Sequence, residues 1–344
     1  MTKIIEIKDK VFKFWAEYEI YLTPVYKFII AFVLFSIISN SIGFMESINS
    51  LPVILVISLV CCLLSQNMTI LIASIVVLLN LYALSIEVAL VALLVFAVLY
   101  FIYFRFAPKF GIWSVLTPIL FHLNIPYILP IGCGLLSSLP AVLGVVCSTV
   151  AFFFIDGIYQ NVTTLSETVE GAEVISKLSV TVSQLLGNKE MYLVIGIFIL
   201  TTIAVYIIRK LTIDHAWKIA IISGVLIQVS GLFAGYMVCN ISGKTVAMIL
   251  GNIVALVFGF VIEFLFMDLD YERTERLQFE DDDYYYYVKA VPKKTVATSD
   301  KKVKQFGNTL TKGRKNAHNS SMLEQADSRK RIAQELEIDE DLLK

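Results

Sequence analysis

Residues 108–160 read PKFGIWSVLTPILFHLNIPYILPIGCGLLSSLPAVLGVVCSTVAFFFIDGIYQ and decide how the chain is organised. The stretch is apolar almost throughout, but prolines and glycines interrupt its first part. Proline removes a backbone donor and clashes with the preceding helical turn, and glycine permits unusual backbone angles. The part before the main break, residues 110–123, is shorter than the roughly 20 residues that a membrane-spanning helix needs. We therefore expect residues 110–136 to form a broken hairpin that enters the membrane and turns back.

The same residues allow a second interpretation, in which a proline-kinked helix crosses the membrane from Ile112 to Leu135. Kinked membrane helices are tolerated because neighbouring helices and side chains satisfy the freed backbone groups. In both interpretations a helix then begins near Ser138, with Pro140 in its first turn, where proline is tolerated, and runs to about Tyr159. Interrupted apolar segments mark the binding sites of many transporters, so this region is the first place to look for function.

The composition is that of a membrane protein. Hydrophobic residues make up 57% of the chain and charged residues 17%, and the charges crowd into the two ends. We expect an all-α polytopic membrane protein with about eight transmembrane helices in residues 23–266. Residues 1–22 carry apolar side chains on one helical face and lysines elsewhere. This pattern predicts an amphipathic N-terminal helix, either at the membrane surface or packed on the protein's own cytoplasmic side.

Residues 51–105 form one apolar run that is too long for a single crossing at about 1.5 Å per residue. Cutting it at Gln66-Asn67 and again at Ser85–Glu87 gives three short spans. A single cut near Asn80 gives two long spans instead. It leaves the side chains of Gln66 and Asn67 in the middle of the membrane, where polar groups need partners. Four other spans have clearer limits. They are 25–44, 191–208, 217–239 and 245–266.

Lysine and arginine cluster near one set of span ends, while acidic residues crowd the loop 163–188, which also contains a short amphipathic pattern. Positive residues are retained on the cytoplasmic side, so both termini are expected in the cytoplasm. In the tail, residues 267–292 contain two β-prone runs on either side of the acidic turn 280–283 and predict a small cytoplasmic β-hairpin. Residues 293–344 read as a basic linker followed by a C-terminal helix or a disordered tail.

Motifs for catalysis, nucleotide binding and metal binding are absent from the sequence. It has no glycine-rich phosphate loop, no histidine pair at metal-ligand spacing and no serine nucleophile elbow. Its five cysteines lie in apolar runs without metal-site spacing. The net charge of −1 gives no reason to expect a nucleic-acid partner. We expect a protein that is not an enzyme and uses no cofactor. A lipid-directed intramembrane enzyme is the weakest alternative, since no nucleophile or acid–base pair is visible.

The candidate substrate path lies in and after the hairpin. Ionisable residues at membrane depth are functional candidates by default, and Asp156 is preferred over Glu87 and Glu263 because it belongs to the helix that leaves the hairpin. Each of the three is also near a span end, where a charge can reach water. Gln228 and Asn252 are expected to bond between the last two spans, and the alternative is that they contact a ligand. The predicted path residues, which are polar or helix-breaking, are His122, Asn124, Pro126, Pro130, Gly132, Gly134 and Asp156.

Four consecutive tyrosines mark the second strand of the tail hairpin. An aromatic strand edge of this kind is typical of a docking site for a cytoplasmic protein partner, which would add a strand or cover the exposed rings. The alternative is that the rings are ordinary strand residues of a small domain. The predicted docking residues are Tyr284, Tyr285, Tyr286 and Tyr287.

The run from Asp270 to Lys293, DYERTERLQFEDDDYYYYVKAVPK, resembles a cytoplasmic tail found in uncharacterised polytopic membrane proteins of Gram-positive bacteria. The resemblance covers this tail and, more loosely, the last three spans. It implies a multi-pass protein of the bacterial plasma membrane, but it assigns no activity and transfers no catalytic residue. We therefore expect a permease-like transport component with an unknown substrate, or a membrane scaffold that recruits a cytoplasmic partner through its tyrosine-rich tail.

Overall fold

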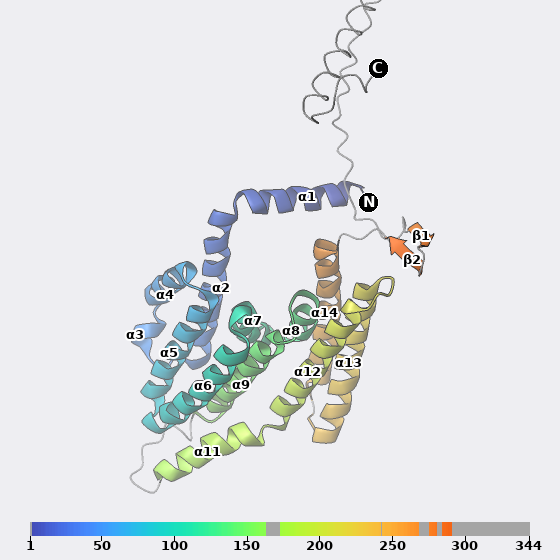
Figure 1. Cartoon of the computed structure of the whole chain (residues 1–344). Coiled ribbons are helices and arrows are strands. Elements are labelled where there is room, and N and C mark those ends of the chain that lie inside the picture. The colour runs from blue at the N-terminus through green and yellow to red at the C-terminus, as the bar shows by residue number, and fades with distance from the viewer. Residues whose placement is uncertain (1, 163–172, 242, 268–274, 281–283, 291–344) are drawn as a thin grey trace, which may run out of the picture. The chain divides into compact units, whose positions relative to one another are not determined.

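The computed structural model describes residues 2–162, 173–241, 243–267, 275–280 and 284–290, which are predominantly helical (Figure 1). Seven of the described helices are long and apolar enough to cross a bilayer, so the expected all-α membrane architecture is confirmed at this level. These helices are α2 (Glu19–Ile42), α5 (Gln66–Leu84), α6 (Ile86–Phe106), α9 (Ala141–Gln160), α12 (Lys189–Lys210), α13 (Ala216–Cys239) and α14 (Thr245–Phe266).

The remaining described elements are shorter. They are α1 (Thr2–Glu17), α3 (Glu46–Asn49), α4 (Leu51–Leu63), the 3-10 helix η1 (Pro108–Phe110), α7 (Gly111–His122), α8 (Ile128–Leu136), α11 (Glu173–Gly187), and the strands β1 (Glu275–Glu280) and β2 (Tyr285–Ala290).

The apolar run 51–105 is divided twice, once between α4 and α5 and again at Ser85 between α5 and α6. Asn67 lies at the first break, where its Oδ1 accepts a hydrogen bond of 2.7 Å from the Tyr103 hydroxyl at the other end of the run. Asn80 lies inside α5. The two-span division with a cut near Asn80 is therefore wrong, because the helices are interrupted before Gln66 and at Ser85, and Asn80 lies within a continuous helix.

Helix α4 lies antiparallel to α2. Near one end of the pair, the Ser39 hydroxyl donates to the carbonyl of Asn49, which precedes α4, at 3.3 Å. Near the other end, Lys27 Nζ donates to the carbonyl of Leu64, which follows α4, at 3.2 Å. Its 13 residues give a length of about 20 Å, less than the roughly 30 Å of a bilayer core.

Helices α7 and α8 form a hairpin rather than one kinked span. At the point where they meet, Asn124 adopts a left-handed conformation with φ of 59°. The indole nitrogen of Trp113, near the start of α7, donates to the Ser137 hydroxyl, just after α8, at 2.6 Å. The chain therefore enters and leaves at the same end of the bundle, and the interpretation of residues 112–135 as a complete crossing is wrong.

The hairpin turns back partway along the bundle. Helix α7 has 12 residues, a length of about 18 Å. It runs alongside α9: a Cβ added at Gly144, near the start of α9, would lie 2.8 Å from Ser114 Oγ. Near the tip, the ring of Phe121 stacks on that of Phe152 with centroids 4.6 Å apart. Since Phe152 lies just past the middle of α9, the tip lies near the middle of the bundle.

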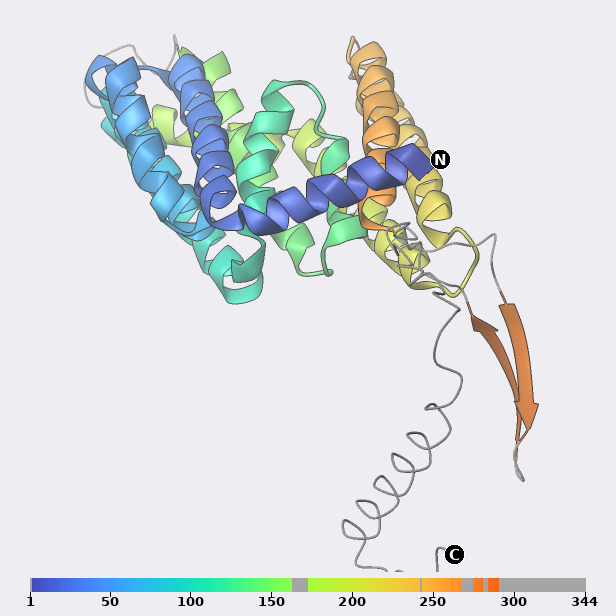
Figure 2. The same cartoon turned by 90° about the horizontal axis from the view of Figure 1, so that it is seen from above.

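The hairpin and α9 lie between two groups of helices, as the view in Figure 2 shows. Helix α7 packs on α2, α5 and α9, whereas α8 packs on α12 and α14. The two larger buried hydrophobic clusters of the described residues follow this division. One includes α2, α4, α5 and α6 and the other α12, α13 and α14, and α7 and α9 contribute side chains to both. The broken segment is therefore the junction between the two halves of the transmembrane region.

Helix α12 holds α8 in place through two features. The Arg209 guanidinium donates to the carbonyls of Leu135 and Ser137 at the C-terminal end of α8, where a cation also complements the helix dipole. A Cβ added at Gly134 of α8 would meet Val205 Cβ at 2.8 Å, so the missing side chain lets the two helices approach closely. We refer below to the two ends of the bundle as the Arg209 end and the Lys244 end.

Helix α1 ends at Glu17, so the predicted 1–22 helix is shorter than expected and its last residues begin α2. It runs across the Arg209 end from α2 toward α14 (Figure 1). Lys8 is buried and its Nζ donates to the Phe264 carbonyl of α14 at 2.8 Å. Apolar side chains elsewhere on α1 remain exposed, among them Ile7 and Trp15. The helix thus packs on the protein while keeping an apolar surface; its position at a membrane surface stays a prediction.

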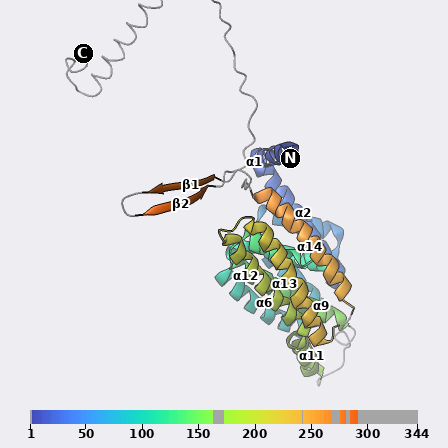
Figure 3. The ribbon, with the colours of Figure 1, turned by 90° about the vertical axis from the view of Figure 1, so that its right-hand side faces the viewer.

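Figure 3 shows α12, α13 and α14 side by side. The strands β1 and β2 pair antiparallel, with Gln278 opposite Tyr287 and Glu280 opposite Tyr285.

Within the loop 163–188, α11 starts at Glu173. The acidic turn at 281–283 and the predictions for residues 293–344 lie outside the described residues.

Candidate functional site at the tip of the broken hairpin

The predicted path residues separate into two groups in the structure. His122 and Asn124 are exposed at the hairpin tip, followed by the buried Pro126. Pro130, Gly132 and Gly134 are buried within α8, which is a regular helix and not an open segment. The glycines let α8 approach neighbouring side chains: a Cβ at Gly132 would lie 3.0 Å from the Trp113 ring. Their visible role is close packing of the second arm.

The hairpin tip is held by a buried amide from α13. Gln228 is completely buried, and its Nε2 donates to the Tyr127 carbonyl at 3.2 Å. This carbonyl belongs to the residue that precedes the first turn of α8, so the amide ties the hairpin tip to α13. The other half of the same amide, Gln228 Oε1, has no hydrogen-bond partner. The expected bond between Gln228 and the last span is replaced by a bond to the hairpin.

Two further buried polar side chains lie at about the same level. Gly259 of α14 packs against Ile221 of α13, and counting two turns along each of these antiparallel helices brings Asn252 opposite Gln228. Asn252 donates to the Met248 carbonyl of its own helix at 2.9 Å, which leaves its Oδ1 without a partner.

Thr201 of α12 completes the group. Its methyl carbon lies 3.6 Å from the Cβ position of Gly224, one turn from Gln228, and its hydroxyl also lacks a partner. Three helices thus bring an unpaired polar atom to the level of the hairpin tip. We call Thr201, Gln228 and Asn252 the tip cluster.

Polar side chains continue from the tip cluster toward the Lys244 end. The side chains of Tyr127 and Tyr236 are both buried and lie within hydrogen-bonding reach of each other. Both are within electrostatic reach of Glu190. Glu190 pairs with Lys244 at 2.7 Å. This row of side chains lies between the Lys244 end and the hairpin tip.

Asp156 lies beside the outer part of this row. It is half-buried, accepts a hydrogen bond of 2.7 Å from Gln160 Nε2, and is within electrostatic reach of Glu190 and Lys244. The structure therefore places Asp156 at the end of the bundle opposite Arg209, away from the hairpin arms. That Asp156 contacts a substrate remains a prediction, and the contact would be made near the Lys244 end of the path.

The chemistry available at the tip cluster is hydrogen bonding. An amide oxygen accepts, a hydroxyl both donates and accepts, and a buried polar atom without a partner costs about 1–3 kcal/mol. Such atoms are normally paired with protein, water or a bound polar molecule. The described residues contain no group of three or more His, Cys, Asp or Glu side chains placed to hold a metal ion.

A separate cavity of about 130 Å³ lies on the other side of the hairpin, between α2, α5, α6, α7 and α9. Its walls are mostly apolar. None of the predicted path residues lines it. Sequence reasoning missed it, because each helix contributes only a few side chains, and these are ordinary residues of apolar spans.

The predicted docking tyrosines lie in and beside β2. Tyr287 is 80% exposed, and Tyr284, Tyr285 and Tyr286 are also exposed. The rings of Tyr284 and Tyr286 also lie near each other, with centroids 6.3 Å apart.

Comparisons with known proteins do not extend the assignment. No protein-family model, no curated protein and no solved structure matches this chain.

Proposed function

We propose that this protein is a permease-like transport component of a bacterial plasma membrane, with a path that passes the tip of the broken hairpin. The observation that carries the proposal is the hairpin tip itself, which ends near the middle of the bundle beside three buried polar atoms without partners. Broken helices at the junction of two helix groups are the usual setting of transporter sites. The substrate that fits the tip cluster is a small polar solute bound through hydrogen bonds.

The membrane arrangement that fits this function has eight crossings, made by the seven long helices together with α4. The α7–α8 hairpin is then re-entrant from the Arg209 end. Arg105, Lys109, Arg209 and Lys210 all lie at or beside helix ends on that side, which favours a cytoplasmic location for it and for both termini. The Glu190–Lys244 row then leads from the outside to the hairpin tip.

Access of water to the tip tests this proposal without knowledge of the substrate. In a variant whose five cysteines are replaced by alanine, Asn124→Cys is expected to react with a membrane-impermeant thiol reagent in oriented vesicles. Leu94→Cys, at an exposed apolar position of α6, is the control and is expected to stay unreactive, since its surface faces lipid. A tip cysteine that remains unlabelled from both sides would refute a water-accessible path.

Uptake provides the second measurement. Vesicles are screened with a panel of small polar solutes, and Gln228→Leu is expected to abolish any protein-dependent uptake, because it removes both the hairpin contact and the unpaired acceptor. Asp156→Asn is expected to reduce uptake if the outer row belongs to the path. Ser230→Ala is the matched control on α13, since Ser230 is exposed and bonds only to its own helix. Full uptake in Gln228→Leu would remove the tip cluster from the path.

A scaffold function is the second candidate, and the exposed tyrosines of β2 favour it. The full-length protein is compared with a variant in which Tyr285 and Tyr287 are replaced by serine. The variant is expected to lose a specific cytoplasmic partner in detergent pull-downs. The same set of captured proteins from both would count against docking through these rings.

A further inference from the structure

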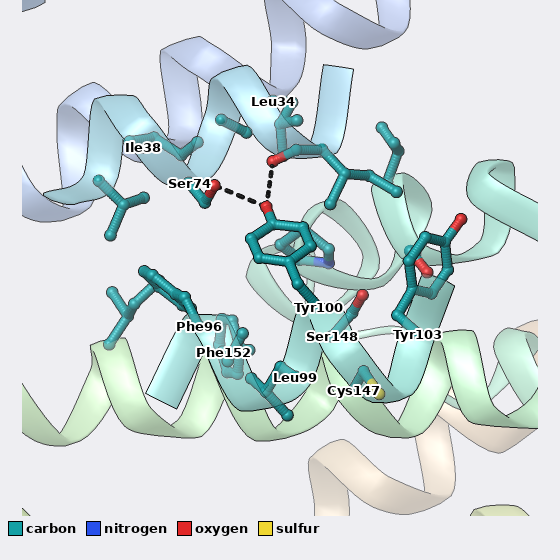
Figure 4. Close-up of a pocket in the computed structure, with 18 residues that line it drawn as sticks. Leu34, Ile38, Ser74, Phe96, Leu99, Tyr100, Tyr103, Cys147, Ser148 and Phe152 are labelled. Atoms are coloured by element: carbon teal, nitrogen blue, oxygen red, sulfur yellow. Dashed lines mark hydrogen bonds between the residues drawn. The ribbon is translucent and has the colours of Figure 1, made fainter. Parts of the chain in front are cut away.

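The cavity between α2, α5, α6, α7 and α9 has the properties of a lipid site (Figure 4). Its volume of about 130 Å³ is close to that of an engineered apolar cavity that stays dry and binds one benzene molecule. It extends from Cys147 to Ile155 along α9, a length of about 12 Å. An elongated apolar space of this size matches a segment of one hydrocarbon chain.

The polar groups of the cavity are unevenly distributed. On the α5–α6 wall, the Tyr100 hydroxyl is bonded to Ser74 Oγ at 2.6 Å and to the Ile70 carbonyl at 2.8 Å, as Figure 4 shows. Those groups are therefore satisfied within the protein. Around them the walls are formed by side chains such as Leu34 and Phe96, which offer only apolar contact.

Ser114 is the exception. It is buried, it lines the cavity, and its Oγ has no hydrogen-bond partner. The Tyr103 hydroxyl lies close enough to Ser114 to interact with it electrostatically, but the geometry gives no hydrogen bond between the two side chains, and Tyr103 instead donates to Asn67 at 2.7 Å. Ser148 of α9 also lines the cavity (Figure 4), one helical turn from Gly144, which packs on Ser114. A ligand that presents a hydrogen-bond acceptor at this point would satisfy the Ser114 donor.

The level of Ser114 in the bundle identifies the kind of acceptor. Ser114 lies beside Gly144, near the start of α9, and so toward the Arg209 end. In the membrane arrangement proposed above, this level lies just inside the headgroups, where lipids carry their ester carbonyls, and hydrocarbon extends from there to the middle of the bilayer. The cavity follows the same order: hydroxyl groups near the Arg209 end, and Phe96, Ile38 and Ile155 deeper.

We propose that this cavity binds one acyl chain of a phospholipid from the leaflet at the Arg209 end, with a chain carbonyl accepting from the Ser114 hydroxyl. Arg105 and Lys109 are exposed beside the same end of α6 and α7 and favour an anionic headgroup. The lipid would pack against the first arm of the hairpin, at Ser114, Val115 and Pro118. This inference does not depend on transport through the tip cluster.

Photo-crosslinking in liposomes tests the proposal. The protein is reconstituted with phosphatidylglycerol that carries a diazirine on its acyl chain, and labelled peptides are mapped after irradiation. Label is expected on the α6 and α9 residues that line the cavity. Ala151→Phe, which places a ring inside the cavity, is expected to remove this label. Ala97→Phe, at an exposed position of α6, is the matched control and is expected to leave it unchanged.

A second variant separates loss of the site from loss of the fold. Ser114→Ala keeps the cavity and removes the donor, so competition by unlabelled phosphatidylglycerol is expected to be roughly five-fold weaker, the factor that one net hydrogen bond supplies. Chasing the bound lipid with excess free lipid then distinguishes a resident molecule, which exchanges slowly, from transported cargo. Equal cavity labelling in wild type and Ala151→Phe, or equal competition in Ser114→Ala, would overturn the proposal.

Discussion

The close approach of α12 and α13 beside the hairpin can be tested with a double-mutant cycle at Gly224 and Val205. A Cβ added at Gly224 would lie 2.6 Å from Val205 Cγ2, whereas its next neighbours are at 3.6 Å, an ordinary contact distance. Gly224→Ala therefore forces the two helices apart or strains the Val205 side chain. Overpacking of this kind costs about 1–3 kcal/mol, partly offset by up to about 1 kcal/mol from the better helix propensity of alanine.

The compensating change is Val205→Ala. Val205 is completely buried, so this change alone is expected to cost about 2–3 kcal/mol through lost burial and the cavity left behind. It also removes the carbon that the new methyl group would strike. In the double variant the methyl group introduced at position 224 fills part of the vacated space, and the total cost is expected to fall below the sum of the single costs by about 1–2 kcal/mol.

The assay is reversible unfolding in mixed detergent micelles, with the free energy of unfolding measured for all four proteins of the cycle. Gly196→Ala is the control, since a Cβ at that position meets nothing within 4 Å. It is expected to be neutral or to stabilise by up to about 1 kcal/mol. If the two single costs add within about 0.5 kcal/mol in the double variant, the close contact between Gly224 and Val205 does not exist as described.

Three further predictions use the same unfolding assay or a simple probe of α1. Arg209→Met is expected to destabilise the protein by about 1.5–3 kcal/mol, because α8 loses charged donors at its C-terminal end. The control Lys210→Met, at an exposed position, is expected to change the free energy of unfolding little. Equal effects of the two substitutions would argue that Arg209 does not cap α8. Asn67→Ala is expected to cost about 1–3 kcal/mol, since it removes the acceptor of the buried Tyr103 hydroxyl; a neutral result would contradict that role. Lys8→Met is expected to release α1 from α14 and speed protease cleavage near the N-terminus, with Lys13→Met unchanged; equal cleavage rates in the two variants would show that the bond to α14 does not hold α1.

The sequence by itself determined the membrane class and most helix limits. Backbone groups cannot be left unpaired in lipid, so a chain can interrupt its helices only where polar side chains, prolines or glycines supply partners or relieve strain. This is why the breaks at Gln66 and Ser85 and the limits of α14 could be read from local composition. It is also why the interruption between α7 and α8 was visible at Asn124 and Pro126.

Only the tertiary structure decided which way the chain goes after that interruption. A kink and a reversal have the same local sequence; the reversal depends on Trp113 meeting Ser137 and on Arg209, far along the chain, binding the end of α8. The tip cluster and the lipid cavity are likewise assembled from several helices each. Their residues are ordinary in sequence, because an unpaired hydroxyl or amide becomes significant only when packing removes its other partners.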